Sequence, residues 1–433
     1  MKMSAVSVRT MARGRSGSYP VVKGPSAAPE SIVPDGSLGR ALLAIAVAQW
    51  ERRPLPPSLN WGALLSAAAA QGLLPLANPL VQESDCPPDV KQAFRLRALG
   101  MALRGRQLED ELGGILEALE GAGADTIVLK GPALANTVYR DPSLRPYTDL
   151  DLLSREEHWP LIHQTLLHLG FAPLNGIREA PPPKIWPGKA YYHSEYYREE
   201  GRLKLDVHYD VWQSGLRPRL GEVFWNRAHR ARIAGRPTRV LARDDQILQT
   251  CVHLHQHGYS RLIWLCDLAL LMRSSQSSQI NWQYVVQAAR SEGIELSVYF
   301  SLCHLRRLLG VASPPWVPCA LRPGFLLAWL HNRVWPPEAI PRPPGRPTID
   351  FQFHELPKAR ALVLNLLFTG RRWEKASYLA HLLVPPAAWL AHYYDASDPA
   401  TLRRRRLAHT PKLLLKALGG LRGFPHLLDG PGP

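Results

Sequence analysis

Two acidic side chains interrupt an apolar run in the segment LRPYTDLDLLS, residues 144–154. Asp149 and Asp151 stand two positions apart and alternate with Leu150 and Leu152, which predicts a strand with both acids on one face. The two carboxylates would project in parallel, about 7 Å apart along the strand. Like charges held in this way repel unless a cation lies between them, and Mg²⁺ or Mn²⁺, which prefer oxygen ligands, would resolve that repulsion.

A second acidic strand is predicted in LKLDVHYDVW, residues 203–212. Lys204, Asp206, His208 and Asp210 share one face of it. Asp206 is the expected third carboxylate, with Asp210 as the alternative on the same face. Three carboxylates around two ions can activate a nucleophilic oxygen and neutralise a triphosphate during phosphoryl transfer. His208 is expected either to orient Asp206 through a hydrogen bond or to be a partly buried polar group.

The segment DTIVLKGPAL, residues 125–134, predicts a short strand that stops at Gly131 and a helix that begins at Pro132. Backbone amides at the start of a helix attract phosphate, and the glycine would let a phosphate approach them. Lys130 would add a point charge, and Arg145 would add a forked donor for phosphate oxygens. Both side chains could instead be ordinary turn or loop residues whose charges lie in solvent.

Composition and periodicity divide the chain into parts that differ in predicted structure. The part with the acidic strands predicts an α+β fold, a small mixed β-sheet core flanked by N-terminal and C-terminal helical regions. The parts are a disordered basic tail at 1–37, a helical region at 38–121, the sheet-containing core at 122–240, a helical bundle region at 241–335, a Pro-rich linker at 336–347, and a C-terminal helical region with a basic tail at 348–433.

The run VLKGPALANTVYRDPSLRPYTDLDLL, followed later by LKLDVHYDVW, resembles the uncharacterised nucleotidyltransferase family of the DNA polymerase β-like superfamily. The segment LHLHQHGYSRLIWLCDLALL resembles the helical half of that family, so the resemblance covers about residues 40–310. It implies Mg²⁺ on Asp149, Asp151 and Asp206, a nucleoside triphosphate along Gly131, and nucleotidyl transfer with release of pyrophosphate. The superfamily usually has Gly-Ser or Gly-Gly at the turn where Lys130-Gly131-Pro132 stands here, so a lysine contact could replace the serine contact.

Several further residues carry two interpretations each. Asp267 lies inside the apolar run LIWLCDLALLM, where an unpaired charge is costly, so it either forms a salt bridge or cap within the bundle or faces the active cleft. His253 and His257 are four residues apart on a predicted helix and could share a metal. Because no third ligand has a suitable spacing, a solvated helix face is the favoured interpretation. Tyr259 and Trp264 could stack on a nucleobase, but core positions are the favoured interpretation for both.

The charge balance favours polyanionic partners. The 433 residues include 52 Lys and Arg against 36 Asp and Glu, a net charge of +16. The C-terminal segment TLRRRRLAHTPKLLLKALGGLRG, residues 401–423, could bind nucleic acid or lie on an anionic membrane surface, or it could be the solvated end of a helix. The longest early apolar run, ALLAIAVA at 41–48, is too short to span a membrane.

The five cysteines are scattered without a CxxC pair, which argues against a disulfide framework and against a structural zinc site. A cytoplasmic location is therefore expected. The sequence as a whole predicts an Mg²⁺-dependent (or Mn²⁺-dependent) nucleotidyltransferase that moves a nucleoside monophosphate from an NTP to an unidentified acceptor, which could be a small molecule, a protein or an RNA. The alternative is a non-catalytic binding or scaffold protein that keeps the fold and engages nucleic acid or an anionic membrane through its basic tails.

Overall fold

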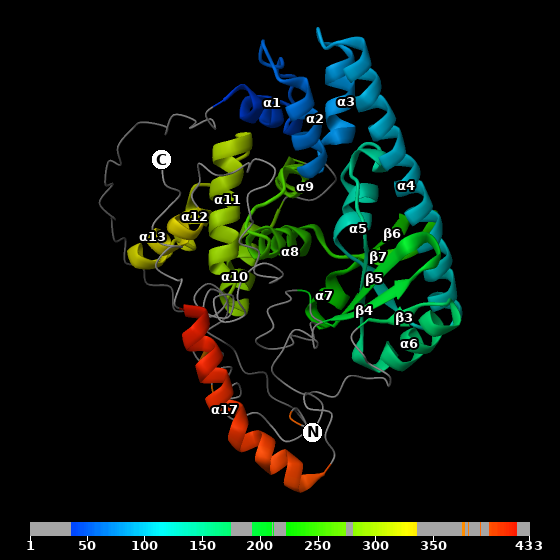
Figure 1. Ribbon diagram of the computed structural model, residues 1–433, viewed down its shortest axis with the longest axis vertical. Coiled ribbons are helices and arrows are strands. Elements are labelled where there is room, and N and C mark those ends of the chain that lie inside the picture. The colour runs from blue at the N-terminus through cyan, green and yellow to red at the C-terminus, as the bar shows by residue number, and fades with distance from the viewer. Residues whose placement is uncertain are drawn as a thin grey trace, which may run out of the picture.

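The computed structural model describes residues 36–174, 193–209, 211, 222–273, 280–335 and 398–421, together with residues 375, 376, 380 and 390. Within them, a mixed sheet lies beside a long helix on one side and a group of shorter helices on the other (Figure 1). The predicted α+β fold with a small mixed sheet is confirmed. The predicted disordered tail and the Pro-rich linker fall outside the described residues, apart from Gly36 and Ser37 at the end of the tail.

The sheet has seven strands in the order β3-β4-β5-β2-β1-β7-β6. Strand β2 pairs in parallel with β5 and antiparallel with β1, and β1 pairs in parallel with β7. The β3–β4, β4–β5 and β6–β7 pairings are antiparallel. The strands are β1 (Thr126–Val128), β2 (Leu150–Ser154), β3 (Ala172–Pro173), β4 (His193–Arg198), β5 (Leu203–His208), β6 (His229–Ile233) and β7 (Arg236–Val240).

Helices precede, connect and follow the strands. The N-terminal helices are α1 (Ser37–Ala46), α2 (Trp61–Ala70), α3 (Leu74–Gln82) and α4 (Pro88–Gly121). The helices between strands are α5 (Lys130–Thr137), α6 (Trp159–His168) and α7 (Glu222–Arg227), with 3₁₀ turns at Pro142–Leu144, Glu156–His158 and Glu200–Arg202. The helices after the sheet are α8 (Arg243–Gln256), α9 (Leu262–Arg273), α10 (Trp282–Glu292), α11 (Glu295–Leu309), α12 (Trp316–Ala320), α13 (Phe325–Val334) and α17 (Pro399–Leu421).

Alternation along the central strands divides the apolar residues between two cores. Leu150 and Leu152 of β2, like Leu205 of β5, pack in a core that also contains residues of α4 and α6. Leu153 packs in the other core, which is built largely from α1–α3, α8, α9 and α11. Because side chains alternate between the faces of a strand, Asp151 projects toward the same side as Leu153. The acids of β2 and β5 therefore face the helical half of the molecule.

Some predicted boundaries shift by a few residues. Strand β2 begins at Leu150, so Asp149 precedes the strand rather than lying within it. Helix α5 begins at Lys130, two residues before the predicted start at Pro132. No helix among the described residues is long and apolar enough to cross a membrane. All five cysteines are free, as expected from their spacing.

Candidate metal centre

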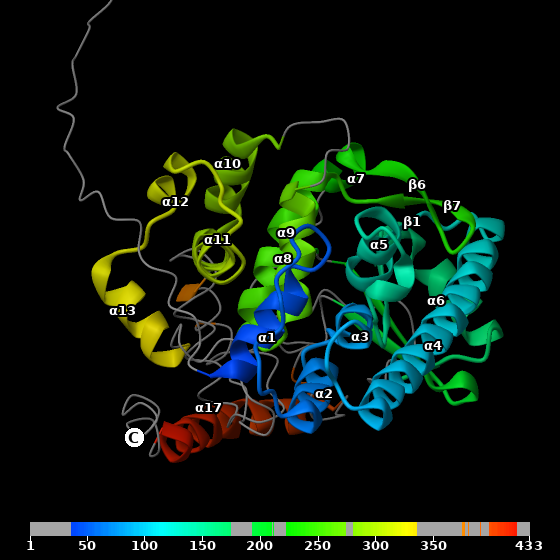
Figure 2. The same cartoon turned by 90° about the horizontal axis from the view of Figure 1, so that it is seen from above.

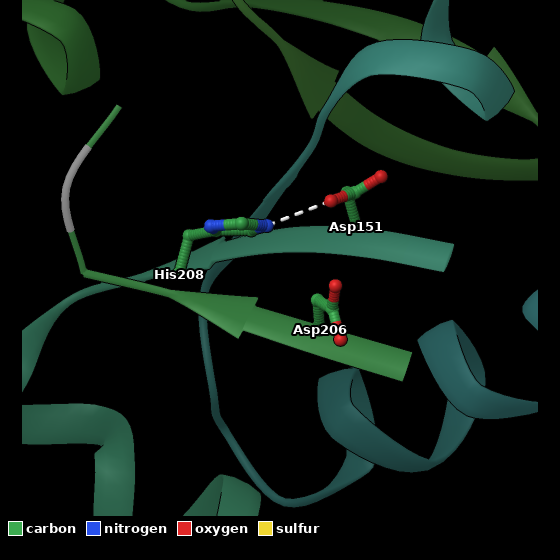
Figure 3. A group of neighbouring side chains, drawn as sticks. All are labelled: Asp151, Asp206 and His208. Atoms are coloured by element: carbon green, nitrogen blue, oxygen red, sulfur yellow. Dashed lines mark hydrogen bonds and ion pairs between the residues drawn. The ribbon is translucent and has the colours of Figure 1, made fainter. Parts of the chain in front are cut away.

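Asp151 and Asp206 lie directly opposite each other on the parallel strands β2 and β5. His208 follows Asp206 two positions along β5 and projects from the same face. One ligand atom from each of Asp151, Asp206 and His208 lies within 4.8 Å of the other two, and the side chains converge as Figure 3 shows. No other group of three such ligands is found among the described residues. We call these three residues the metal centre.

The Asp151 carboxylate is buried, but it is held in its charged form. Lys130 Nζ donates a hydrogen bond to Asp151 Oδ1 over 2.6 Å, and His208 Nε2 lies 2.7 Å from the same oxygen. Burial alone would raise the pKa of Asp151, but Lys130 and His208 outweigh burial and hold that pKa well below its ordinary value. Asp151 is therefore an anion at neutral pH.

The Asp206 carboxylate has the opposite environment. Lys204 Nζ lies 3.3 Å from Asp206 Oδ2, whereas Asp206 Oδ1 is buried and has no hydrogen-bond partner among the described residues. Burial, followed by the negative charge of Asp151, raises the pKa of Asp206 to about 7. An orphaned carboxylate oxygen beside a second, anionic carboxylate fits a divalent cation. The two carboxylates supply the oxygen ligands that Mg²⁺ and Mn²⁺ prefer, and the imidazole adds a nitrogen donor.

Asp149 lies at the edge of this arrangement. It is half-buried and is not one of the three converging ligands. Burial, followed by the charge of Asp151, raises the pKa of Asp149, while Lys130, Lys204 and Arg145 act in the opposite direction. The structure thus brings Asp151 and Asp206 together, with His208 in the third position, and leaves Asp149 beside them. The role of Asp149 as a metal ligand stays a prediction.

The turn before α5 connects the predicted phosphate site to the metal centre. The Leu129 amide donates a hydrogen bond to the Asp151 carbonyl over 2.9 Å, and Lys130 has a φ of +47°, in the left-handed region that non-glycine residues seldom adopt. A Cβ atom at Gly131 would lie 2.7 Å from the Cβ of Tyr147. The glycine is therefore required for close packing of α5 on Tyr147, whatever it contributes to phosphate binding.

Comparison with known proteins identifies the family. The model of a family described as "uncharacterised nucleotidyltransferase" matches residues 57–310, more than half of the 433 residues. The chain belongs to this family. The matched residues include the metal centre, and the family expected from the sequence is confirmed.

Curated proteins and solved structures add little to the family assignment. No curated protein matches the nucleotidyltransferase-family chain. A solved structure, described as an antigenic nucleotidyltransferase-like protein from Paracoccidioides brasiliensis, matches with 15% identity and a TM-score of 0.30, over 50% of this chain and 91% of that one.

Arg145 of this nucleotidyltransferase-family chain is engaged in a buried ion pair with Asp267 of α9. Nε of Arg145 lies 3.0 Å from Asp267 Oδ1, Nη2 lies 2.7 Å from Oδ2, and Nη1 donates to the Pro146 carbonyl over 2.7 Å. The Tyr139 hydroxyl donates to Asp267 Oδ1 over 2.7 Å. Asp267 thus forms a salt bridge, which is one of the two alternatives predicted for it from the sequence. A nucleotide contact by Arg145 stays a prediction.

Two predictions for histidines are corrected. His208 contacts Asp151 rather than Asp206, because the register of β2 and β5 places its Nε2 next to the Asp151 carboxylate. His253 and His257 are half-buried instead of solvated, since their rings pack on Trp264 at centroid distances of 4.6 and 4.9 Å. Tyr259 is a core residue as expected.

Two more residues of the predicted acidic strand, Asp210 and Lys204, remain to be placed. Asp210, the alternative third carboxylate, lies outside the described residues. Lys204 was recognised in the sequence only as a neighbour of Asp206 on the same strand face. Its Nζ forms ion pairs with Asp206 and Glu195, at 3.3 and 3.2 Å. Alternation along the strand places Lys204 beside Asp206, so the sequence contained a signal for that ion pair. The ion pair with Glu195 depends on the pairing of β4 with β5.

Proposed function

We propose that this chain is a metal-dependent nucleotidyltransferase that moves a nucleoside monophosphate from an NTP to an acceptor and releases pyrophosphate. The single observation that carries the proposal is the buried Oδ1 of Asp206, which has no hydrogen-bond partner among the described residues and lies within a group of ligands that includes the anionic Asp151. This oxygen lies beside the anionic Asp151 and can bind a cation, and the family of the chain is that of nucleotidyltransferases.

In this proposal Asp151, Asp206 and His208 bind Mg²⁺ or Mn²⁺, and Asp149 supplies a further carboxylate. The bound ion would neutralise the phosphate oxygens and polarise the acceptor oxygen. Lys130, whose Nζ reaches Asp151 Oδ1, would donate to the triphosphate once the ion takes over that oxygen. The amides at the start of α5 near Gly131 would bind phosphate through their N–H groups.

The reaction would be an in-line displacement at the α-phosphorus. The acceptor oxygen forms a bond to this phosphorus as the bond to the bridging oxygen of pyrophosphate breaks. The acceptor loses a proton in this step, and a carboxylate with a raised pKa is suited to accept it. Asp149 has such a pKa and lies next to the metal centre. The acceptor is a nucleophile of unidentified class, a small molecule, a protein side chain or an RNA end.

Metal-dependent nucleotide binding tests the proposal. Isothermal titration with each of the four NTPs, in Mn²⁺ and then in Mg²⁺, should give binding that a chelator abolishes. Asp151→Asn and Asp206→Asn should each weaken that binding by about tenfold or more, because metal ligands are lost. Glu117→Gln is the matched control, since it also removes one carboxylate charge but on the solvent-exposed side of α4. Wild-type protein without metal-dependent NTP binding would overturn the proposal.

A second candidate function, a non-catalytic nucleotide-binding protein, is favoured by one contact. The Lys130 ammonium already neutralises Asp151 at 2.6 Å, in the way that a bound cation would. Such a protein would bind NTP without consuming it. Incubating labelled NTP with a cell extract separates the two functions, because an enzyme releases pyrophosphate and labels an acceptor in a reaction that Asp151→Asn abolishes.

A further inference from the structure

A compact group of aromatic rings lies where α8 ends and α9 begins. The ring centroids of His253 and His257 are 4.4 Å apart, and those of His253 and Trp264 are 4.6 Å apart. The centroids of His257 and Trp264 are 4.9 Å apart. We call these three residues the His–Trp cluster. The Arg261 guanidinium carbon lies 5.7 Å from the centroid of the Trp264 ring.

The His–Trp cluster lies on the side of the sheet that the metal centre faces. Helices α8 and α9 lie between α5 and α11 (Figure 2). Trp264 is one helical turn before Asp267, so both project from one side of α9, and Asp267 binds Arg145, four residues before Asp149. Among the influences on the pKa of His253 are the charges of Lys130, Asp151 and Arg145. Helix α9 thus carries the cluster residue Trp264 and, through Asp267, is joined to the segment that leads into the metal centre.

The cluster is neither a filled core nor an isolated surface group. His253, His257 and Trp264 are half-buried and Arg261 is exposed, whereas the neighbouring Tyr259 is only 1% exposed. Burial, His257 and Lys130 hold the pKa of His253 well below its ordinary value, so its imidazole is neutral at neutral pH. Neutral imidazole and indole rings offer apolar faces with polar edges. Nucleobases stack on such rings, and an exposed arginine nearby can bind a phosphate.

We propose that the His–Trp cluster binds the base of the nucleoside triphosphate while Arg261 contacts its phosphate chain. This inference rests on the proposed function, because it assumes that an NTP occupies the metal centre. The triphosphate would extend from Lys130 and the metal centre toward α9, and the base would lie against His257 and Trp264. Stacking does not depend strongly on base identity, so these residues would contribute affinity for all four NTPs.

Comparison of ATP with inorganic tripolyphosphate isolates the contribution of the base. In the presence of Mn²⁺, His257→Ala and Trp264→Ala should each weaken ATP binding by about 5- to 100-fold, the usual range for loss of one stacking partner. The affinity for tripolyphosphate, which has no base, should stay within about twofold of wild type. Trp282→Ala on α10 is the matched control, because it removes another half-buried tryptophan that packs on the same core. It should leave both affinities unchanged.

The outcomes separate this inference from the proposed function. Wild-type protein that binds neither ligand with metal would overturn both. If wild-type protein binds ATP, and the cluster variants bind ATP as tightly or lose ATP and tripolyphosphate affinity equally, only the inference is overturned. His257→Ala is retained as the second variant because it removes a smaller side chain, so the test stands if Trp264→Ala does not fold.

Discussion

Asp151 and Asp206 carry the same functional group on neighbouring strands, yet their surroundings give them opposite acidities. Two hydrogen-bonding partners, Lys130 and His208, converge on Asp151 Oδ1. Asp206 has only the more distant Lys204, at 3.3 Å, and one of its oxygens is unpaired among the described residues. The free energy of holding Asp206 ionised is therefore unfavourable without a cation, which is characteristic of residues kept for function rather than for stability.

This difference predicts that Asp206→Asn stabilises the metal-free protein at high pH. The folded-state pKa of Asp206, about 7, exceeds the unfolded value of about 3.9, so its contribution to stability is present below pH 4 and is lost as the pH rises through 7. With chelator present at pH 8, the variant should melt about 2 °C or more above wild type, and the difference should disappear near pH 4.

Asp151→Asn serves as the contrasting variant in the same experiment. The folded-state pKa of Asp151 is lowered, so its contribution to stability is present above the unfolded pKa and is lost as the pH falls. That variant should melt below wild type at pH 8. Asp206→Asn melting below wild type at pH 8 in chelator would contradict the assignment of Asp206 as a carboxylate that is destabilised in its ionised form.

At the scale of elements, the start of α5 depends on the close approach of Gly131 to Tyr147. Gly131→Ala places a Cβ atom 2.7 Å from the Cβ of Tyr147, and the backbone must shift because the obstructing atom cannot rotate away. We expect a destabilisation of about 1–3 kcal/mol in urea unfolding. Gly114→Ala on the exposed face of α4 meets no atom within 4 Å and should stabilise by about 0.5–1 kcal/mol. Equal effects of the two substitutions would refute the packing explanation for Gly131.

The Arg145–Asp267 ion pair joins the segment before β2 to α9. Both side chains are almost fully buried, with exposed fractions of 6% and 1%. Asp267→Asn leaves the Arg145 charge buried without its counter-ion, so the free energy of unfolding should fall by about 3–5 kcal/mol. Replacing both residues, by Arg145→Met and Asp267→Leu, should recover much of this loss. Glu117→Gln, which breaks an exposed ion pair with Arg236, should cost about 1 kcal/mol or less.

The sequence predicted the elements that follow from periodicity. The long helix α4 and the strands β2 and β5 form where their patterns predicted them, because apolar residues that share a face recur with the period of the element. The pairing register leaves no such trace. The register sets Asp151 opposite Asp206 and Leu153 opposite His208. It thereby brings His208 within hydrogen-bonding distance of Asp151. The partner of Asp267 was equally inaccessible, since Arg145 lies 122 residues away along the chain.

At the scale of the whole molecule, segments far apart in sequence share a core. Residues of α1–α3 pack with residues of α8, α9 and α11, while α4 and α6 cover the other face of the sheet with a second core. The metal centre lies on the sheet face that is turned toward the first core. Helices that precede the sheet in sequence and helices that follow it thus lie together on the face with the predicted nucleotide site. Helix α9 supplies both Asp267 and Trp264.

The net charge of +16 has a concentrated source in α17. Arg403–Arg406 are consecutive and exposed on this helix, and Leu407 beside them is 80% exposed. We expect the run to bind polyanions through counterion release. Replacing the four arginines by glutamine should lower the slope of log K against log salt for a single-stranded RNA by about 3. This slope can be measured by fluorescence anisotropy between 50 and 200 mM salt. Over this range the affinity of a protein that makes several phosphate contacts falls by about 10³–10⁵.

A variant of equal net charge tests whether α17, rather than the overall charge, makes these contacts. Its four substitutions to glutamine fall on exposed arginines of α4 and β6, namely Arg95, Arg97, Arg230 and Arg232. This control should keep most of the wild-type slope, because long-range attraction is screened within about 10 Å at 0.1 M salt whereas direct phosphate contacts release counterions one by one. A control that loses as much slope as the α17 variant would assign RNA binding to the whole surface and leave α17 as a solvated helix.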